Sequence, residues 1–109
     1  MPVDRGALAP VLTLYWREYC HLCHDLLADL LALREALGRE VGAAVRGQNG
    51  AAEIFAVDIR DVDADPVLEA RYDERVPVLA AAVGTDGEKE LCHYHLDPAA
   101  VRAYLAEIR

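Results

Sequence analysis

The stretch from residue 11 to residue 37, VLTLYWREYCHLCHDLLADLLALREAL, decides the fold that this sequence predicts. It opens with a short apolar run at residues 11–16, rich in β-forming side chains, which is typical of a buried strand. From residue 22 to residue 37 leucines recur at spacings of three and four, which predicts an amphipathic helix that ends at Gly38. Cys20 and Cys23 lie between the predicted strand and the predicted helix.

The rest of the chain continues this alternation of strands and helices. Further strands are predicted at residues 53–59, 78–83 and 90–96, and further helices at residues 67–73 and 99–108. Acids at residues 61–65 are suited to capping a helix. Residues 38–50 are predicted to form a glycine-rich loop with a short helical piece at 41–46, and residues 84–87 a turn.

The order of these elements, β-α-β-α-β-β-α, predicts an α/β fold. The first two strands are joined through a helix and should be parallel, whereas the last two form an antiparallel hairpin. We therefore expect a four-stranded mixed sheet with helices on both faces. Residues 1–10 are predicted to be a flexible N-terminal arm, and residues 11–109 a single domain.

The composition excludes several classes of function. Among 109 residues there is no serine, which excludes a serine hydrolase, and Lys89 is the only lysine, which leaves no candidate for a Walker-type phosphate loop. The formal net charge of −8 disfavours nucleic acid and anionic membranes as partners. The sequence contains neither a recognisable secretory signal nor an apolar stretch of membrane-spanning length, and three cysteines are no secreted disulfide framework. We therefore expect a cytoplasmic protein.

A cysteine at the start of a helix has special reactivity. The unpaired backbone N–H groups of the first turn and the positive end of the helix dipole both stabilise a thiolate over a thiol. A second cysteine three residues later lies one turn further on, close enough to form a disulfide with the first. The placement of Cys20 and Cys23 after a strand, within a β-α-β pattern, therefore indicates thiol–disulfide exchange.

Three elements together make the sequence resemble the thioredoxin fold and, within it, the glutaredoxin-like family. They are Tyr19-Cys20-His21-Leu22-Cys23, Val76-Pro77, and Leu96-Asp97-Pro98 before the last helix. The resemblance implies a thiol–disulfide oxidoreductase in which Cys20 is the exposed nucleophile and Cys23 resolves the mixed disulfide. We expect no cofactor apart from the redox-active Cys20–Cys23 disulfide, and no metal.

The resemblance also implies which residues bind the substrate. A cis peptide bond before Pro77 would leave the backbone of Val76 free to pair with an extended thiol substrate. Arg17 would lie near the thiolate and near the carboxylate of glutathione. His21 and Leu22 depart from the proline and the aromatic residue that glutaredoxins usually have between the cysteines, and a protonated His21 would favour the thiolate. The full expected set is Arg17, Tyr19, His21, Leu22, Val76, Pro77, His95 and Asp97. The implied partners of this protein, expected to be a monomer, are protein or low-molecular-weight thiols and disulfides, with glutathione as a candidate co-substrate.

Two departures from the family pattern bear on the substrate. Glutaredoxins bind glutathione beside a Gly-Gly pair just before the last helix, whereas this chain has Tyr94 and His95 there. Thioredoxins have a buried acid six residues before the first cysteine, whereas this chain has Leu14. The bulk of Tyr94 and His95 predicts poor glutathione binding, and without that acid no carboxylate opposes a thiolate at Cys20.

Two alternatives to an oxidoreductase remain open. One is a carrier of a metal ion or iron–sulfur cluster, because cysteines and nearby histidines can act as ligands: Cys20, Cys23, His21, His24, His93 and His95. The other is a thioredoxin-fold binding module whose cysteines are not catalytic. Cys92 is expected to be a buried strand cysteine. A straight strand would place it about 16 Å from Asp97, too far to join the Cys20–Cys23 pair.

Overall fold

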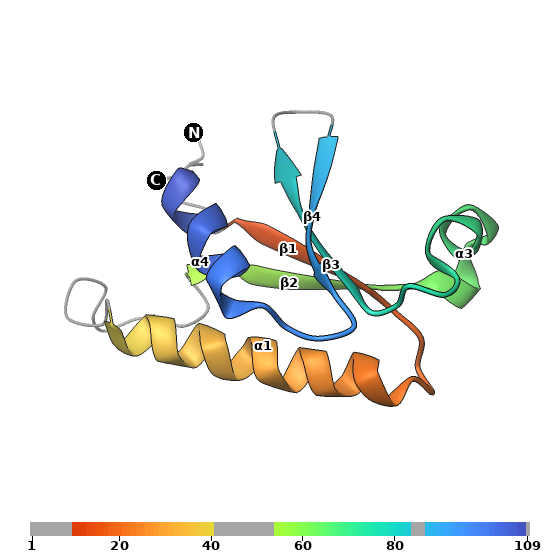
Figure 1. The fold of residues 1–109 in the computed structure, drawn as a ribbon, viewed down its shortest axis with the longest axis horizontal. Helices are drawn as coiled ribbons and strands as arrows, with labels where there is room; N and C mark the ends of the chain where they lie inside the picture. The colour runs from red at the N-terminus through yellow and green to blue at the C-terminus, as the bar shows by residue number, and fades with distance from the viewer. Residues whose placement is uncertain (1–9, 41–53, 84–86, 109) are drawn as a thin grey trace, which may run out of the picture.

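The computed structural model describes residues 10–40, 54–83 and 87–108, and it consists of one four-stranded sheet with helices on both faces (Figure 1). The strands are β1 (Val11–Trp16), β2 (Ala56–Asp61), β3 (Val78–Val83) and β4 (Gly87–His93). The helices are α1 (His21–Glu40), the 3-10 helix η2 (Val62–Ala64), α3 (Pro66–Tyr72) and α4 (Pro98–Glu107).

The strands lie in the order β2-β1-β3-β4. β1 pairs with β2 in parallel and with β3 antiparallel, and β3 pairs antiparallel with β4. The predicted α/β class, the mixed sheet and the parallel first pair are therefore confirmed. β1, the strand that precedes the cysteine pair, is therefore an inner strand with a partner on each side, β2 and β3.

Alternation along β1 divides the interior into two layers. Leu12 and Leu14 are fully buried in the larger core, which includes the leucine stripe of α1 and the inner face of α4. Tyr15 points to the opposite face of the sheet and packs with Val62 and Tyr72 from the η2–α3 segment. A period of two along the strand thus places α1 and α4 on one face and α3 on the other.

Two predicted boundaries near α1 and β2 are wrong. α1 continues through Gly38 to Glu40, with Gly38 buried inside the helix. A glycine inside a helix costs only about 1 kcal/mol relative to alanine, and burial of Leu37 beside it offsets that cost. β2 begins at Ala56 rather than at residue 53, because fully buried Phe55 packs into the larger core just before the strand.

The last strand is also displaced from its prediction. β4 ends at His93, which pairs with Val78, the first residue of β3. The chain then turns at Tyr94, whose φ of 65° lies in the left-handed region, so residues 94–96 are not part of the strand. Because of this turn, Asp97 comes close to the Cys92 thiol, so the separation of about 16 Å expected for a straight strand is wrong.

Several predictions lie outside the described residues. These are nearly all of the N-terminal arm, the helical piece at 41–46 and most of the turn at 84–87. Pro10, the last residue of the arm, accepts a hydrogen bond from the Ala56 N–H at 2.8 Å, which extends the pairing of β1 with β2 by one residue. No described helix has the length and apolar character needed to cross a membrane.

The packed face of α1 predicts that alanine substitutions at two neighbouring leucines lower the free energy of unfolding by different amounts. Leu30 is fully buried in the larger core, whereas Leu31 is 36% exposed. Leu30→Ala should lower the free energy of unfolding by about 3 kcal/mol, because it leaves a cavity against the sheet. Leu31→Ala, the matched control, should lower it by less than about 1 kcal/mol. Urea denaturation measures both, and equal costs would contradict the assignment of the packed face.

Candidate active site

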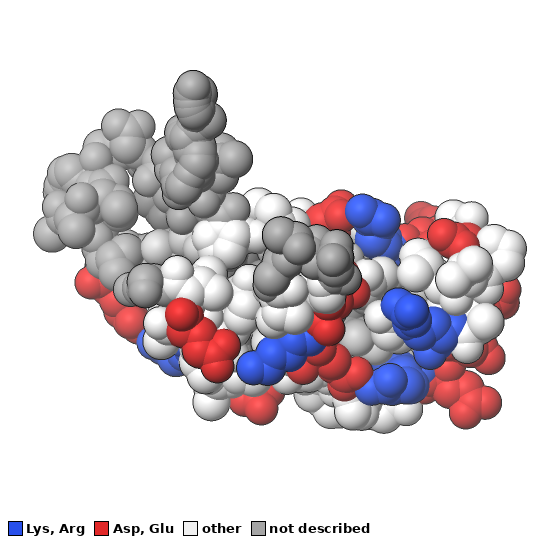
Figure 2. Space-filling view, turned by 90° about the horizontal axis from the view of Figure 1, so that it is seen from above, with Lys and Arg blue, Asp and Glu red and all other residues white. Residues whose placement is uncertain are grey.

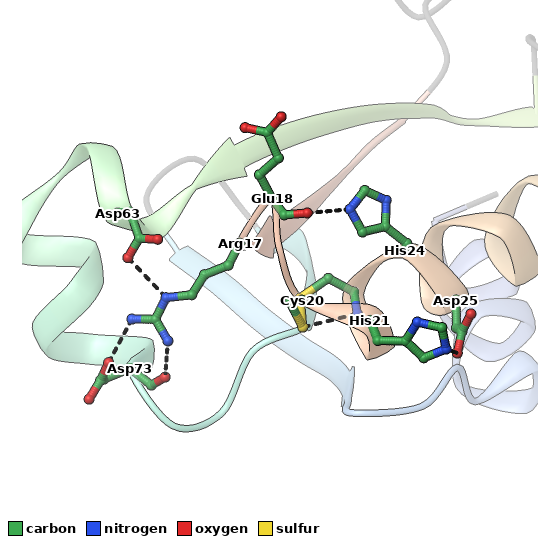
Figure 3. Close-up of a disulfide and its surroundings, with 9 residues drawn as sticks. Arg17, Glu18, Cys20, His21, His24, Asp25, Asp63 and Asp73 are labelled. Atoms are coloured by element: carbon green, nitrogen blue, oxygen red, sulfur yellow. Dashed lines mark hydrogen bonds and ion pairs between the residues drawn. A yellow bond between two sulfur atoms is a disulfide. The ribbon is translucent and has the colours of Figure 1, made fainter.

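The cysteine pair lies where β1 passes into α1. Cys20 immediately precedes α1 and forms a disulfide with Cys23 in the first turn, with a Cα–Cα distance of 5.2 Å (Figure 3). Cys20 is partly exposed, whereas Cys23 is fully buried beneath it. Only the first sulfur of the pair is therefore open to a reagent from solvent.

Backbone hydrogen bonds hold the Cys20 sulfur at the helix start. The Cys20 N–H donates to the Arg17 carbonyl at 3.2 Å, and the His24 N–H donates to the Cys20 carbonyl at 3.2 Å. The Cys23 N–H donates to the Cys20 sulfur itself at 3.1 Å. Cys20 thus occupies the position of a helix-capping side chain, where N–H donors and the helix dipole favour a negative sulfur.

His24 fixes the loop that leads into this helix, and sequence reasoning named it only as a metal ligand. Its Nε2 bonds to the Glu18 carbonyl (Figure 3). Its ring packs against Trp16 at a centroid distance of 4.6 Å. The signal was available in the spacing, since His24 lies one helical turn after Cys20. His24 therefore ties the end of β1 to the first turn of α1.

Arg17 does not face the cysteine pair, which corrects the expectation that it lies near the thiolate. Its guanidinium points away and donates to Asp63 at 2.9 Å and to the Asp73 carboxylate at 2.6 Å (Figure 3). Hydrogen bonds to Asp73 and then to Asp63 raise its pKa. The physical reason is local charge: three acids of the η2–α3 segment, Glu69 included, surround the guanidinium and leave its side chain 16% exposed.

The two residues between the cysteines lie on the surface. The His21 ring is turned along the helix toward Asp25, at 3.5 Å, rather than toward the Cys20 sulfur (Figure 3). Leu22 is 37% exposed, and Tyr19, just before the pair, is 80% exposed. The rim of the cysteine pair is therefore apolar and aromatic on the side of Tyr19 and Leu22.

The segment before β3 has the backbone that the resemblance implies. The Val76–Pro77 bond is cis, and Pro77 is fully buried. Val78 pairs with Tyr15 near the end of β1, so Val76 and Pro77 lie at the sheet end where the chain enters the cysteine loop. The Tyr94 N–H donates to the Pro77 carbonyl at 2.9 Å, which adds the turn after β4 to the same end.

Asp97 and His95, both expected to bind substrate, have different surroundings. The Asp97 carboxylate caps α4 and accepts hydrogen bonds from the Ala99 and Ala100 N–H groups at 3.1 and 3.2 Å. His95 is exposed, and its backbone N–H donates to the His93 carbonyl at 2.7 Å. Asp97 is thus already engaged in local structure.

Cys92 and the histidines form no common cluster. Burial raises the pKa of the half-buried Cys92 thiol, which has no disulfide partner among the described residues. Within residues 10–40, 54–83 and 87–108, no three side chains of the ligand types His, Cys, Asp and Glu come together to hold a metal ion. Three of the histidines have other partners instead. His21 lies beside the Asp25 carboxylate, and His93 beside the Glu90 carboxylate. His24 bonds to the Glu18 carbonyl.

Solved structures similar to this chain come from several organisms. Protein Ne2328 from Nitrosomonas europaea is 30% identical, with a TM-score of 0.64 over 94% of this chain and 98% of that chain. Protein XcR50 from X. campestris is 32% identical, with a TM-score of 0.52 over 88% of this chain and 96% of that chain. Chloroplastic thioredoxin z, 17% identical with a TM-score of 0.55 over 94% of this chain and 80% of that chain, shares the fold.

The family follows from a match over nearly the whole described domain. No curated protein matches the chain. The family model described as "Glutaredoxin-like domain (DUF836)" matches residues 11–106, which include the cysteine pair, the cis Val76–Pro77 bond and the Asp97 cap. The chain therefore belongs to the glutaredoxin-like domain family and has the thioredoxin fold.

Proposed function

We propose that this protein is a thiol–disulfide oxidoreductase whose redox-active group is the Cys20–Cys23 pair. The observation that carries the proposal is the placement of the Cys20 sulfur at the start of α1, where the Cys23 N–H donates to it at 3.1 Å. That donor is free of any intrahelical partner in the first turn, so it can stabilise a thiolate. The buried Cys23 is one turn away, the distance needed to resolve a mixed disulfide.

The reaction transfers two electrons from the dithiol to a substrate disulfide. The Cys20 thiolate attacks one substrate sulfur, the substrate S–S bond breaks, and one substrate thiolate leaves. Cys23 then gives its proton to the substrate thiolate released in the first step and attacks the Cys20 sulfur. The mixed disulfide breaks, the second substrate thiolate leaves, and the Cys20–Cys23 disulfide forms. An external dithiol or two monothiols return the pair to its reduced form.

The substrate in this proposal is a protein or low-molecular-weight disulfide in the cytoplasm, bound by a monomer without a further cofactor. Tyr19 and Leu22 offer an apolar contact surface beside Cys20, and the Val76 backbone offers strand-like pairing. Glutathione is a poor candidate for a further reason beyond the bulk of Tyr94 and His95. Its carboxylates need cations, whereas Arg17 is held by Asp63 and Asp73.

The order of attack gives the first test of this proposal. A reduced Cys23→Ser variant, mixed with a disulfide-linked peptide pair, should accumulate one stable mixed disulfide on Cys20, because no thiol resolves it. Peptide mapping by mass spectrometry locates the adduct. Cys20→Ser, the matched control, should form almost none, because Cys23 is fully buried. A main adduct on Cys92, or equal trapping by both variants, would refute the assigned roles.

The second test concerns the source of the thiolate stabilisation. Alkylation rates of Cys20 against pH, measured in a Cys23→Ser/Cys92→Ser protein, should give a pKa below the free-thiol value of about 8.5. Arg17→Gln should change that pKa by less than about half a unit, because the guanidinium points to the η2–α3 acids. A pKa at or above that of free cysteine would show that the start of α1 does not stabilise the Cys20 thiolate. A rise of a full unit in Arg17→Gln would show that Arg17 acts on the thiolate.

The third test concerns glutathione. A peptide carrying a glutathione mixed disulfide should be reduced at least about tenfold more slowly than the same peptide carrying a 2-mercaptoethanol mixed disulfide, a loss of about 1.4 kcal/mol in transition-state binding. Tyr94→Gly should reduce the difference between the two reduction rates. Glycine tolerates the φ of 65°, and the substitution removes the ring. Ala99→Gly, close to the same turn, is the control. Faster reduction of the glutathione adduct by the wild-type protein would contradict the prediction.

A further inference from the structure

The sheet face that carries α3 is hollowed between α3 and β4. A cavity of about 650 Å³ lies there, and its volume is within the range of small-molecule sites. Its floor includes Tyr15 and Tyr72, one wall includes Arg71 and Arg75 from the α3 side, and the opposite wall includes Glu88 and Glu90 from β4. This face is opposite to α1, so an occupant would not cover the Cys20–Cys23 disulfide.

The floor of the cavity is a rigid aromatic surface. The rings of Tyr15 and Tyr72 stack with centroids 4.4 Å apart and planes inclined by 26°. Both residues are buried by their packing with Val62, Val78 and Ala80. The floor is therefore preorganised, and it presents to the cavity only the small exposed parts of the two side chains, 6% of Tyr15 and 8% of Tyr72.

The two walls carry opposite charges, and part of that charge is already neutralised. Arg75 pairs with Glu90, which also accepts from His93 Nδ1 at 2.7 Å, so these side chains bridge the walls. Figure 2 shows positive and negative side chains interspersed on the face it displays, without a broad area of either sign. The remaining wall charges, Arg71 and Glu88, decide which ligand the cavity can take.

Arg71 and Glu88 form no ion pair with any other described residue. The Arg71 guanidinium lies 5.8 Å from the centre of the Tyr72 ring. Glu88 accepts a hydrogen bond from the Tyr15 hydroxyl at 2.8 Å, which orients its carboxylate over the floor. Arg60 on β2 contributes positive charge near Tyr15 and Glu88, but its guanidinium donates to Asp58 at 2.8 Å.

We propose that this cavity binds a small dipolar ligand with a flat apolar middle. A carboxylate of the ligand pairs with the Arg71 guanidinium, an ammonium group pairs with Glu88, and the apolar middle contacts the small exposed parts of Tyr15 and Tyr72 between them. A ligand with only negative charge would be repelled by Glu88 and Glu90. A ligand with only positive charge would be repelled by Arg71 and Arg75. The opposite walls therefore select for both charges in one molecule.

The probe that tests this site is 4-(aminomethyl)benzoate, a flat zwitterion with its two charges at opposite ends. Titration into the oxidised full-length protein, followed by NMR of the tyrosine rings and backbone amides, should shift resonances of Tyr15, Tyr72 and β4. Benzoate and benzylamine, each with half of the charge pattern, should bind at least about tenfold more weakly, equivalent to about 1.4 kcal/mol. Binding of benzoate or benzylamine as tight as that of the zwitterion would overturn the proposal.

Matched variants locate the binding. Arg71→Gln and Glu88→Gln should each weaken binding of the zwitterion by about fivefold or more, because each removes one charge–charge contact. Arg39→Gln and Glu35→Gln are the controls, since these exposed residues pair with each other on α1. Unchanged binding in Arg71→Gln or Glu88→Gln, or shifts confined to α1, would refute the site. None of these readouts depends on thiol chemistry, so the result is independent of the proposed oxidoreductase activity.

Discussion

The packing of the α1 leucine stripe against the central strands is the constraint on which the rest of the molecule depends. Leu26 and Leu30 lie in the same core as Leu12 and Leu14 of β1, so the helix can start only a few residues after the strand ends. This places Cys20 directly before the first turn, with its sulfur beside the Cys23 N–H. The reactivity proposed for Cys20 is thus a consequence of core packing, which sets the geometry of the helix start.

In this acidic chain, ion pairs with carboxylates determine where the arginine side chains lie. Arg17 joins the cysteine loop to the η2–α3 segment, Arg75 joins the segment before Pro77 to β4, and Arg102 joins α4 to Glu40 at the end of α1. With a net charge of −8, most of the cations among the described residues pair with a carboxylate. Backbone N–H groups rather than side-chain cations therefore supply the positive potential at the Cys20 sulfur.

The turn after β4 shows how a bulky residue can occupy a backbone position that glycine normally favours. Tyr94 has a φ of 65°, a conformation that costs a non-glycine residue of order 1 kcal/mol or more. Its N–H donates to the Pro77 carbonyl at 2.9 Å, and its hydroxyl donates to the Glu74 carbonyl at 2.8 Å, which offset the cost. Through these two hydrogen bonds Tyr94 holds the segment before β3 in place. Its ring fills the space that a small residue would leave open.

Sequence by itself determined the order of elements, the parallel first strand pair and the place of Cys20 and Cys23 at a helix start, because hydrophobic period and capping chemistry act over neighbouring residues. Side-chain partners distant in sequence were decided only by the tertiary structure. The orientation of Arg17 depends on acids 46 and 56 residues away, and the end of β4 depends on where β3 begins. The turn after β4 also depends on a distant contact, because the Tyr94 N–H donates to the Pro77 carbonyl, and strand length is set by the partner strand rather than by local propensity.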